Sequence, residues 1–243
     1  MHWVYIFCVI LLAAVLKGLT GFGFALLAMP LLIFIFPVKL IIPLLTFFNL
    51  FSSTMIVLKR PTERSGIRAL ILPAWGIVGL IPGVLFLHLV EEQTIRIFAG
   101  IMLSLLALAF LLGYRYNIRK PARATMISGM ISGFLGGSIS VSGPPLAFFL
   151  TSMNTSNENF RNKFAWFNVF NASIALVGYY TADLIVPQNM KMAIYLLPVL
   201  VIGTIIGQRL SSKVPVALFR KICIWISFLS GLTVLFNTLY GLI

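Results

Sequence analysis

Residues 17–31 read KGLTGFGFALLAMPL, and residues 132–146 read SGFLGGSISVSGPPL. The two stretches align without a gap at an offset of 115 residues, and four pairs coincide: Gly18 with Gly133, Gly21 with Gly136, Pro30 with Pro145 and Leu31 with Leu146. Each is a glycine-rich break inside a long apolar run. Within a bilayer, a broken helix is tolerated only where protein or a water-filled cavity satisfies the freed backbone groups. Paired breaks in two halves of a membrane chain therefore indicate the binding site of a transporter.

The composition is that of a membrane protein. Of the 243 residues, 60% are hydrophobic and 9% are charged, and the mean hydropathy is +1.06. Apolar runs of about twenty residues recur along the chain, which predicts an all-α polytopic membrane protein. The net charge of +13 is better explained by basic loops that set the topology than by binding to nucleic acid. Cys8 and Cys223 lie inside apolar runs, where we expect inert packing residues.

The apolar pattern predicts eight helical segments, of which the first and the fifth are broken, near residues 17–23 and 137–143. They span residues 3–36, 39–58, 67–89, 95–114, 122–153, 161–181, 190–210 and 216–242. The last four segments repeat the first four. Besides the breaks, residues 47–51 match residues 166–170, and residues 79–96 match residues 203–220 at four positions. We therefore divide the chain into a first repeat (1–114), a basic linker (115–123) and a second repeat (124–243).

The distribution of Lys and Arg decides between two topologies. If every segment crosses the membrane once, nine basic residues lie on one side and eight on the other. If each broken segment is a hairpin that enters and leaves on the same side, one side collects fourteen, at positions 59, 60, 64, 68, 115, 119, 120, 123, 161, 163, 209, 213, 220 and 221. The other side keeps Lys39, Arg96 and Lys191, and Lys17 lies inside the first hairpin.

Because Lys and Arg accumulate on the cytoplasmic side of a membrane, the second topology is preferred. It predicts two inverted repeats, each made of a broken-helix hairpin and three transmembrane helices. Both termini and Asn189 then lie outside the cell, and Ser65 and Ser212 lie in the cytoplasm. The two hairpins enter from opposite faces, so their tips can meet near the middle of the membrane.

A new half-helix is expected to begin after each break, near Phe24 and near Pro144. The first N–H groups of a helix have no internal partner and carry partial positive charge, so a helix start at membrane depth is an anion site. We expect the N–H groups of residues 142–145 to face the anion. The candidate substrate-binding residues are Lys17, Thr20, Gly21, Gly23, Asn49, Gly136, Gly137, Ser138, Ser140, Ser142, Gly143, Asn168 and Asn171.

Each group of candidates has a structural alternative. Small residues at a break also let membrane helices pack closely, although two symmetric breaks favour a site. Lys17 either attracts an anion or extends its side chain to the membrane interface. The asparagines, of which Asn49 and Asn168 occupy matching positions, either bind substrate or tie the hairpins to the scaffold.

Several kinds of site are not expected. The five acidic residues fall in loops or at helix ends, so neither a proton relay of buried carboxylates nor a cation-selective carboxylate ring is available. His2 and His88 are too far apart and too peripheral for a metal site. No catalytic or phosphate-binding motif stands out, so we expect neither an enzyme nor a cofactor.

Together these features resemble the TauE/SafE family of sulfite and organosulfur anion exporters, which are duplicated membrane modules. The match rests on Gly18–Leu31, Gly133–Leu146, the Phe-Asn pairs that end at Asn49 and Asn168, and residues 203–210 with Pro215. The first break departs from the commoner glycine run, because Phe22 and Phe24 flank Gly23. The resemblance implies transport of sulfite, sulfoacetate, other sulfonates or related small anions.

We therefore expect an exporter of a small sulfur-containing or carboxylated anion that works by alternating access. It would lie in the cytoplasmic membrane of a bacterium, with the anion and the lipid bilayer as its partners. A homodimer is one assembly that the sequence leaves open. The alternatives are a passive anion channel and a non-transporting membrane subunit.

Overall fold

The computed structural model describes residues 2–59, 70–112, 121–153, 157–211 and 216–240, which contain ten α-helices and no β-strand. The helices are α1 (His2–Thr20), α2 (Phe24–Leu32), α3 (Val38–Lys59), α4 (Ile71–Leu89), α5 (Glu92–Leu111), α6 (Pro121–Ile139), α7 (Gly143–Ser152), α8 (Asn157–Thr181), α9 (Pro187–Leu210) and α10 (Val216–Leu239). The predicted helical class is thus confirmed. Ser65, Ser212 and residues 115–120 of the predicted linker lie outside the described residues, and residues 121–123 belong to the first turn of α6.

Five of the helices, as described, are long and apolar enough to cross a membrane: α1, α3, α4, α5 and α9. Helix α8 is the longest at 25 residues, but its first two turns carry charged and amide side chains. The eight predicted segments correspond to the ten helices, because the first and the fifth are each divided in two.

The first break is built from glycine backbone and one hydroxyl group. Gly21 and Gly23 have φ angles of +84° and +90°, in the left-handed region that favours glycine. The hydroxyl of Thr20 lies 2.9 Å from the carbonyl oxygen of Leu16 and 2.6 Å from that of Phe22, and it accepts a bond from the N–H of Phe22. Thr20 therefore satisfies backbone groups that the helix end leaves open, and the chain reverses within three residues.

The second break lies one helical turn later than the glycine alignment places it. Helix α6 continues to Ile139, and the left-handed residue is Ser140, with φ at +59°. Helices α2 and α7 begin at Phe24 and Gly143, an offset of 119 residues, which is also the offset between Asn49 and Asn168. The two breaks and the two asparagines thus share one structural register. The aligned glycines, which are 115 residues apart, do not occupy equivalent structural positions.

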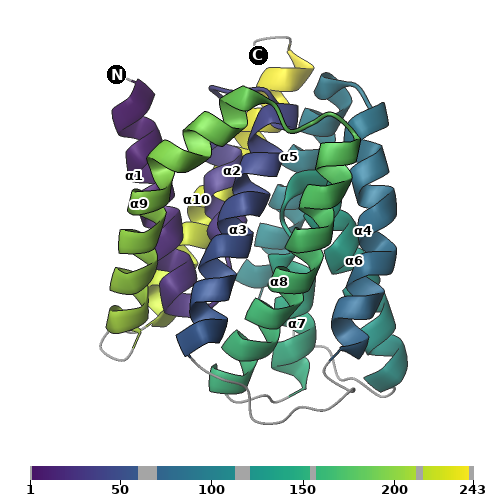
Figure 1. The fold of residues 1–243 in the computed structure, drawn as a ribbon, viewed down its shortest axis with the longest axis vertical. Helices are drawn as coiled ribbons and strands as arrows, with labels where there is room; N and C mark the ends of the chain where they lie inside the picture. Colours follow the sequence, from purple (N-terminus) through teal and green to yellow (C-terminus); the bar gives the residue numbers. More distant parts are fainter. Residues whose placement is uncertain (1, 60–69, 113–120, 154–156, 212–215, 241–243) are drawn as a thin grey trace.

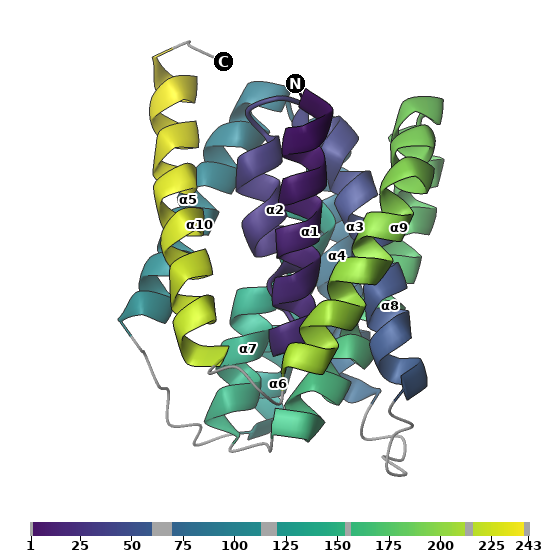
Figure 2. The same cartoon turned by 90° about the vertical axis from the view of Figure 1, so that its left-hand side faces the viewer.

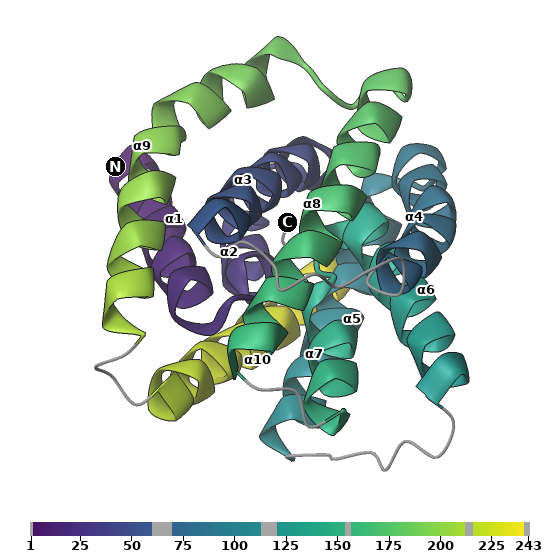
Figure 3. The same cartoon turned by 60° about the horizontal axis from the view of Figure 1, so that its bottom comes forward.

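The hairpins point in opposite directions (Figure 1). Helix α1 begins, and α10 ends, at the upper end of the molecule in that view, whereas α3 ends and α6 begins at the lower end. The α1–α2 hairpin therefore opens upward and the α6–α7 hairpin downward. Helices α3 and α8 contact each other between the α1–α9 pair and the α4–α6 pair (Figure 3). Helix α10 runs beside α5 and α2 (Figure 2).

Glycines allow the close approach of the two outer pairs. A Cβ atom on Gly133 of α6 would lie 1.9 Å from the carbonyl oxygen of Gly76 on α4. A Cβ atom on Gly207 of α9 would lie 2.2 Å from the carbonyl oxygen of Val15 on α1. In each pair the two backbones are in contact at a glycine, and a larger residue in place of that glycine would push the two helices apart.

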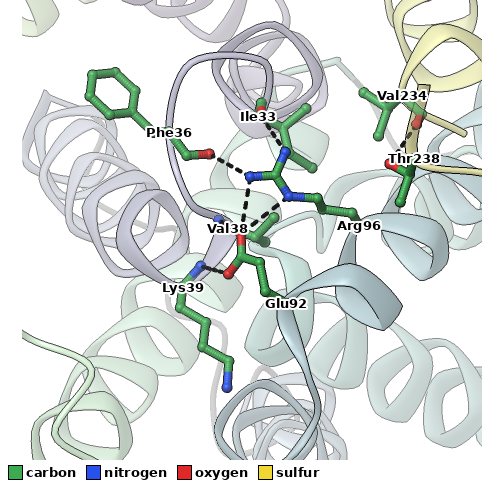
Figure 4. A network of polar contacts seen from close by, with 8 residues as sticks. All are labelled: Ile33, Phe36, Val38, Lys39, Glu92, Arg96, Val234 and Thr238. Carbon is green, nitrogen blue, oxygen red and sulfur yellow. Dashed lines mark hydrogen bonds and ion pairs between the residues drawn. The ribbon is translucent and has the colours of Figure 1, made fainter. Parts of the chain in front are cut away.

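A polar clamp on α5 holds the connection between α2 and α3 (Figure 4). Glu92 accepts hydrogen bonds from the N–H groups of Val38 and Lys39, which begin α3. Arg96 donates to the carbonyl oxygens of Ile33 and Phe36 and pairs with Glu92 at 3.3 Å. The clamp satisfies groups at the end of α2 and at the start of α3, and so fixes the first hairpin at its open end.

Candidate functional site

The two breaks lie side by side. A Cβ atom on Gly143 would lie 3.5 Å from the ring of Phe22 and 3.9 Å from the backbone nitrogen of Gly23. The second break is also tied to α3, because Ser140 accepts a hydrogen bond from the hydroxyl of Thr46 at 3.0 Å. The amide of Asn49 donates to the same hydroxyl oxygen at 3.3 Å. Elements from both halves therefore build one polar centre.

Two small cavities lie at this centre. The tip cavity is lined by residues 22–26, residues 140–143, Asn49, Phe164 and Asn168. The adjoining cavity shares Asn49, Ser140, Ser142 and Asn168 with the tip cavity. Its remaining lining residues are Thr46, Leu80, Ser132, Gly136, Asn171, Ala172 and Ala175.

Helix α2 points its N-terminus into the tip cavity. Its first internal hydrogen bond runs from the N–H of Leu27 to the carbonyl of Gly23, so the N–H groups of Phe24, Ala25 and Leu26 have no protein acceptor in the described chain. All three residues line the cavity. The helix dipole adds partial positive charge at this point. This helix start can therefore hold an anion through its backbone.

Asn168 supplies a side-chain donor to both cavities. Its amide oxygen accepts a hydrogen bond from the hydroxyl of Ser142 at 3.0 Å. Its amide nitrogen has no hydrogen-bond partner in the described residues, although only 5% of the residue is exposed. This nitrogen can therefore donate to a ligand or to water.

Lys17 lies inside the protein. The residue is fully buried, and its ammonium donates to the backbone oxygen and to the side-chain oxygen of Asn49, both at 2.9 Å. That is not the geometry of a lysine that reaches for the membrane interface. Lys17 lines neither cavity, so it meets the candidate site through Asn49.

Two candidates on α6, Ser138 and Gly137, have structural partners and line neither cavity, and Asn171 on α8 also has structural partners. Ser138 donates to the carbonyl of Phe134 within its own helix at 2.7 Å. Gly137 packs against α4, where a Cβ atom would lie 2.7 Å from the carbonyl oxygen of Leu80. The amide nitrogen of Asn171 donates to Phe167 and, across to α4, to Pro73, although Asn171 also lines the adjoining cavity.

Helix α7 offers fewer backbone donors than we expected. Residues 144 and 145 are both proline, and proline carries no N–H group. Of residues 142–145, only Ser142 and Gly143 can therefore donate to an anion, and both line the tip cavity. The expectation that all four backbone groups face the anion is wrong. The richer helix start for an anion is that of α2.

Three candidates, Thr20, Gly21 and Gly23, lie in the first break itself. Thr20 caps the end of α1, whereas Gly21 lies against Arg161 and Gly23 lines the tip cavity. On the second hairpin, Gly136 and Gly143 each line one cavity.

Sequence reasoning missed two polar residues, Thr46 at this centre and Arg161 beside the first break. Thr46 precedes Asn49 by three residues on α3, so the helical period alone would have placed both on one face. Arg161 was assigned to a cytoplasmic helix end, but it is only 9% exposed and donates to the backbone oxygen of Gly18. No local pattern signals that contact, because 143 residues separate the partners.

No acidic side chain that the structure describes lines the candidate site. Among the acids whose side chains the structure describes, Glu91, Glu92 and Asp183, none lines either cavity. Within the same ranges, no group of three His, Cys, Asp or Glu residues is arranged to hold a metal ion. The candidate site combines neutral donors, the nearby Lys17 and, in the adjoining cavity, Asn171, whose buried side-chain oxygen has no donor in the described residues.

Comparison with known proteins gives one family. The family model described as "Sulfite exporter TauE/SafE" matches residues 6–234, a range that includes both breaks and every residue lining the two cavities. No curated protein and no solved structure matches the chain.

Proposed function

The chain belongs to the TauE/SafE family of sulfite exporters, and we propose that it carries a small sulfur-containing or carboxylated anion out of the cell by alternating access. The observation that carries this proposal is the tip cavity, where the three unpaired N–H groups of α2 and the unpaired amide of Asn168 face one space. Donors without acceptors in a buried cavity fit an anionic substrate.

The arrangement of helices supports two inverted repeats, with residues 1–114 and 124–243 as the halves and 115–123 as the linker. The hairpins open toward opposite ends (Figure 1), and each packs against a helix of the other half: α1 on α9, and α6 on α4. Under the repeat, α4 corresponds to α9. Rocking of such halves around a central site is a common route to alternating access.

We propose that the lower end in Figure 1 faces the cytoplasm and that both termini lie outside, in the inner membrane of a bacterium. The described basic residues support this orientation, because α3 ends at Lys59, α6 has Arg123 in its first turn and α9 ends beside Arg209, all at that lower end. Lys and Arg mark the cytoplasmic side.

Transport needs no catalytic step and no proton relay in this scheme. A negatively charged substrate leaves the cell down the inside-negative membrane potential, which supplies about 2.3 kcal/mol per charge per 100 mV. The lack of carboxylates in both cavities fits this mechanism. The substrate exchanges its hydration for N–H and amide donors as the site closes over it.

The test is transport by purified protein in lipid vesicles. Thermal-shift measurements first rank sulfite, thiosulfate, methanesulfonate, sulfoacetate, sulfate and short carboxylates, and efflux from loaded vesicles then gives rates. We expect saturable efflux of at least one of these anions. Asn168→Leu, which keeps the branched shape and removes the amide, should weaken its binding by about 10- to 100-fold.

Two outcomes would contradict the proposal. Flux that rises with anion concentration without saturation would identify a passive channel. A protein that binds none of these anions, while remaining folded in the same membranes, would instead be a non-transporting subunit. Ser173→Ala is the matched control, because that serine is exposed and bonds within its own helix.

A further inference from the structure

The Lys17 side chain is fully buried and pairs with no carboxylate of the described residues. Two of its N–H groups donate to oxygens of Asn49, and the third has no acceptor in the part of the chain that the structure describes. Both acceptors are neutral, and no described carboxylate pairs with Lys17. An uncompensated charge in a protein interior is costly, so a bound anion nearby would stabilise it.

Lys17 also determines how Asn49 presents its amide. An ammonium group donates and cannot accept, so the side-chain oxygen of Asn49 must face Lys17. The amide nitrogen of Asn49 is thereby turned toward Ser140, where its contacts are long, at 3.3 and 3.5 Å. Asn49 lines both cavities, so this nitrogen is available to a ligand.

Asn168 repeats this orientation from the opposite half. Its side-chain oxygen accepts from Ser142, which leaves its amide nitrogen unpartnered at the same cavities. Two amide nitrogens and the start of α2 therefore converge as donors. Only one of them, that of Asn49, is linked directly to a positive charge.

We infer that the site takes an anion with a single negative charge, and that Lys17 supplies the counter-charge through Asn49. This inference rests on the proposed function and specifies its substrate by charge. One ammonium balances one negative charge, and a second charge would remain buried without compensation. Arg161 donates to Gly18, which lines neither cavity, whereas Lys17 donates to Asn49, which lines both.

The chemical consequence concerns which sulfur anions bind. Hydrogensulfite, alkanesulfonates and monocarboxylates carry one charge and fit the site. The doubly charged sulfite ion and sulfate do not. Near neutral pH, sulfite exists as both forms, so the protein would export the hydrogensulfite fraction.

The first test compares methanesulfonate with sulfate on the unmodified protein. Both are tetrahedral at sulfur and similar in size, but they carry one and two charges. We expect sulfate to compete at least about 10-fold less well than methanesulfonate. The affinity for total sulfite should also rise from mildly alkaline to mildly acidic pH, whereas the affinity for methanesulfonate should stay constant.

The second test separates the charge of Lys17 from its hydrogen bonds. Lys17→Gln keeps a donor for the oxygen of Asn49 without the charge, Lys17→Met removes both, and Lys17→Arg keeps both. If Lys17 is the counter-charge, the Gln and Met variants lose about 10- to 100-fold in methanesulfonate affinity, and the Arg variant retains most of it. A purely structural role predicts that Gln matches the unmodified protein and that only Met fails.

Lys163→Gln is the matched control, because it removes one exposed lysine from α8 and should leave the affinity unchanged. Thermal unfolding without anion checks that the Lys17 variants fold, and we expect Lys17→Gln and Lys17→Met to fold, since neither buries a charge. Equal binding of sulfate and methanesulfonate, or full affinity in Lys17→Gln, would overturn the inference and leave the proposed function intact. Absence of any anion binding by the unmodified protein would instead overturn the proposed function.

Discussion

Arg161, in the second turn of α8, donates a hydrogen bond from its guanidinium to the backbone oxygen of Gly18, near the end of α1. Its aliphatic stem lies against Gly21, where a Cβ atom would come within 2.8 Å of the Arg161 Cγ atom. The same turns of α8 bring Phe160 and Phe164 against Phe22, with ring centroids 5.7 and 5.6 Å apart. One half of the chain thus holds the hairpin tip of the other.

Replacing Arg161 should destabilise the protein. Arg161→Ala removes the donor to the Gly18 carbonyl and leaves that oxygen buried, at a cost of roughly 1.5–3 kcal/mol. We expect a lower unfolding temperature for the purified protein in detergent. Arg123→Ala removes an exposed arginine from α6 and should leave the unfolding temperature unchanged. Equal unfolding temperatures for the two variants would show that the hydrogen bond from Arg161 to Gly18 does not contribute to stability.

Two glycines of α6 should respond differently to alanine. In Gly133→Ala, the new methyl group would meet the Gly76 carbonyl at 1.9 Å, so α4 and α6 would have to separate. Overpacking of this kind costs roughly 1–3 kcal/mol, and we expect poor yield and early unfolding.

Gly136→Ala is the matched variant, because its methyl group would meet only the Cβ atom of Ser142, at 3.3 Å. It should fold, and it should slow transport, since Gly136 lines the adjoining cavity. Unfolding temperature and vesicle efflux, measured on both proteins, separate the two effects. A Gly133→Ala protein as stable as the unmodified one would contradict the described packing of α4 on α6.

The serines of the second break should not be equivalent. Ser140→Ala and Ser142→Ala each remove a hydroxyl that lines both cavities and contacts an asparagine, so substrate affinity should fall by about 10-fold or more. Ser138→Ala removes a hydroxyl bonded within its own helix, so affinity should change little. Efflux kinetics at varied substrate concentration would measure this, and equal effects at all three positions would contradict it.

The orientation in the membrane can be tested with single cysteines on intact cells. Gln188 is exposed at the start of α9, whereas its neighbour Asn189 is 3% exposed and bonds to Leu184 and Leu40, so Gln188→Cys is the better external probe. Ala122→Cys is an exposed probe in the first turn of α6, at the opposite end.

In a background without Cys8 and Cys223, we expect an impermeant thiol reagent to label Gln188→Cys in intact cells. Ala122→Cys should react only after the cells are opened. The reverse pattern would invert the proposed orientation, and labelling of both in intact cells would show that the two positions share one side.

Much of the fold is determined by the sequence itself, because its causes are local. Apolar runs long enough for a bilayer become helices, since a chain in lipid must satisfy its own backbone groups. Gly21 and Gly23 take left-handed conformations that other residues avoid, so these two glycines mark the first break in the sequence. Helix starts were also predicted near Phe24 and near Pro144, and α2 and α7 begin at Phe24 and Gly143.

The tertiary structure alone decided which of these residues meet. The glycine alignment suggests that Gly136 corresponds to Gly21, yet the left-handed residue of the second break is Ser140, because α6 runs one turn further along α4. The hydroxyl of Ser138 donates within its own helix, Lys17 donates to Asn49, and Arg161 donates to the carbonyl of Gly18. These outcomes depend on helix rotation and on contacts between distant segments. Hydropathy cannot reveal them, because it records how apolar a stretch is and not which face meets a partner.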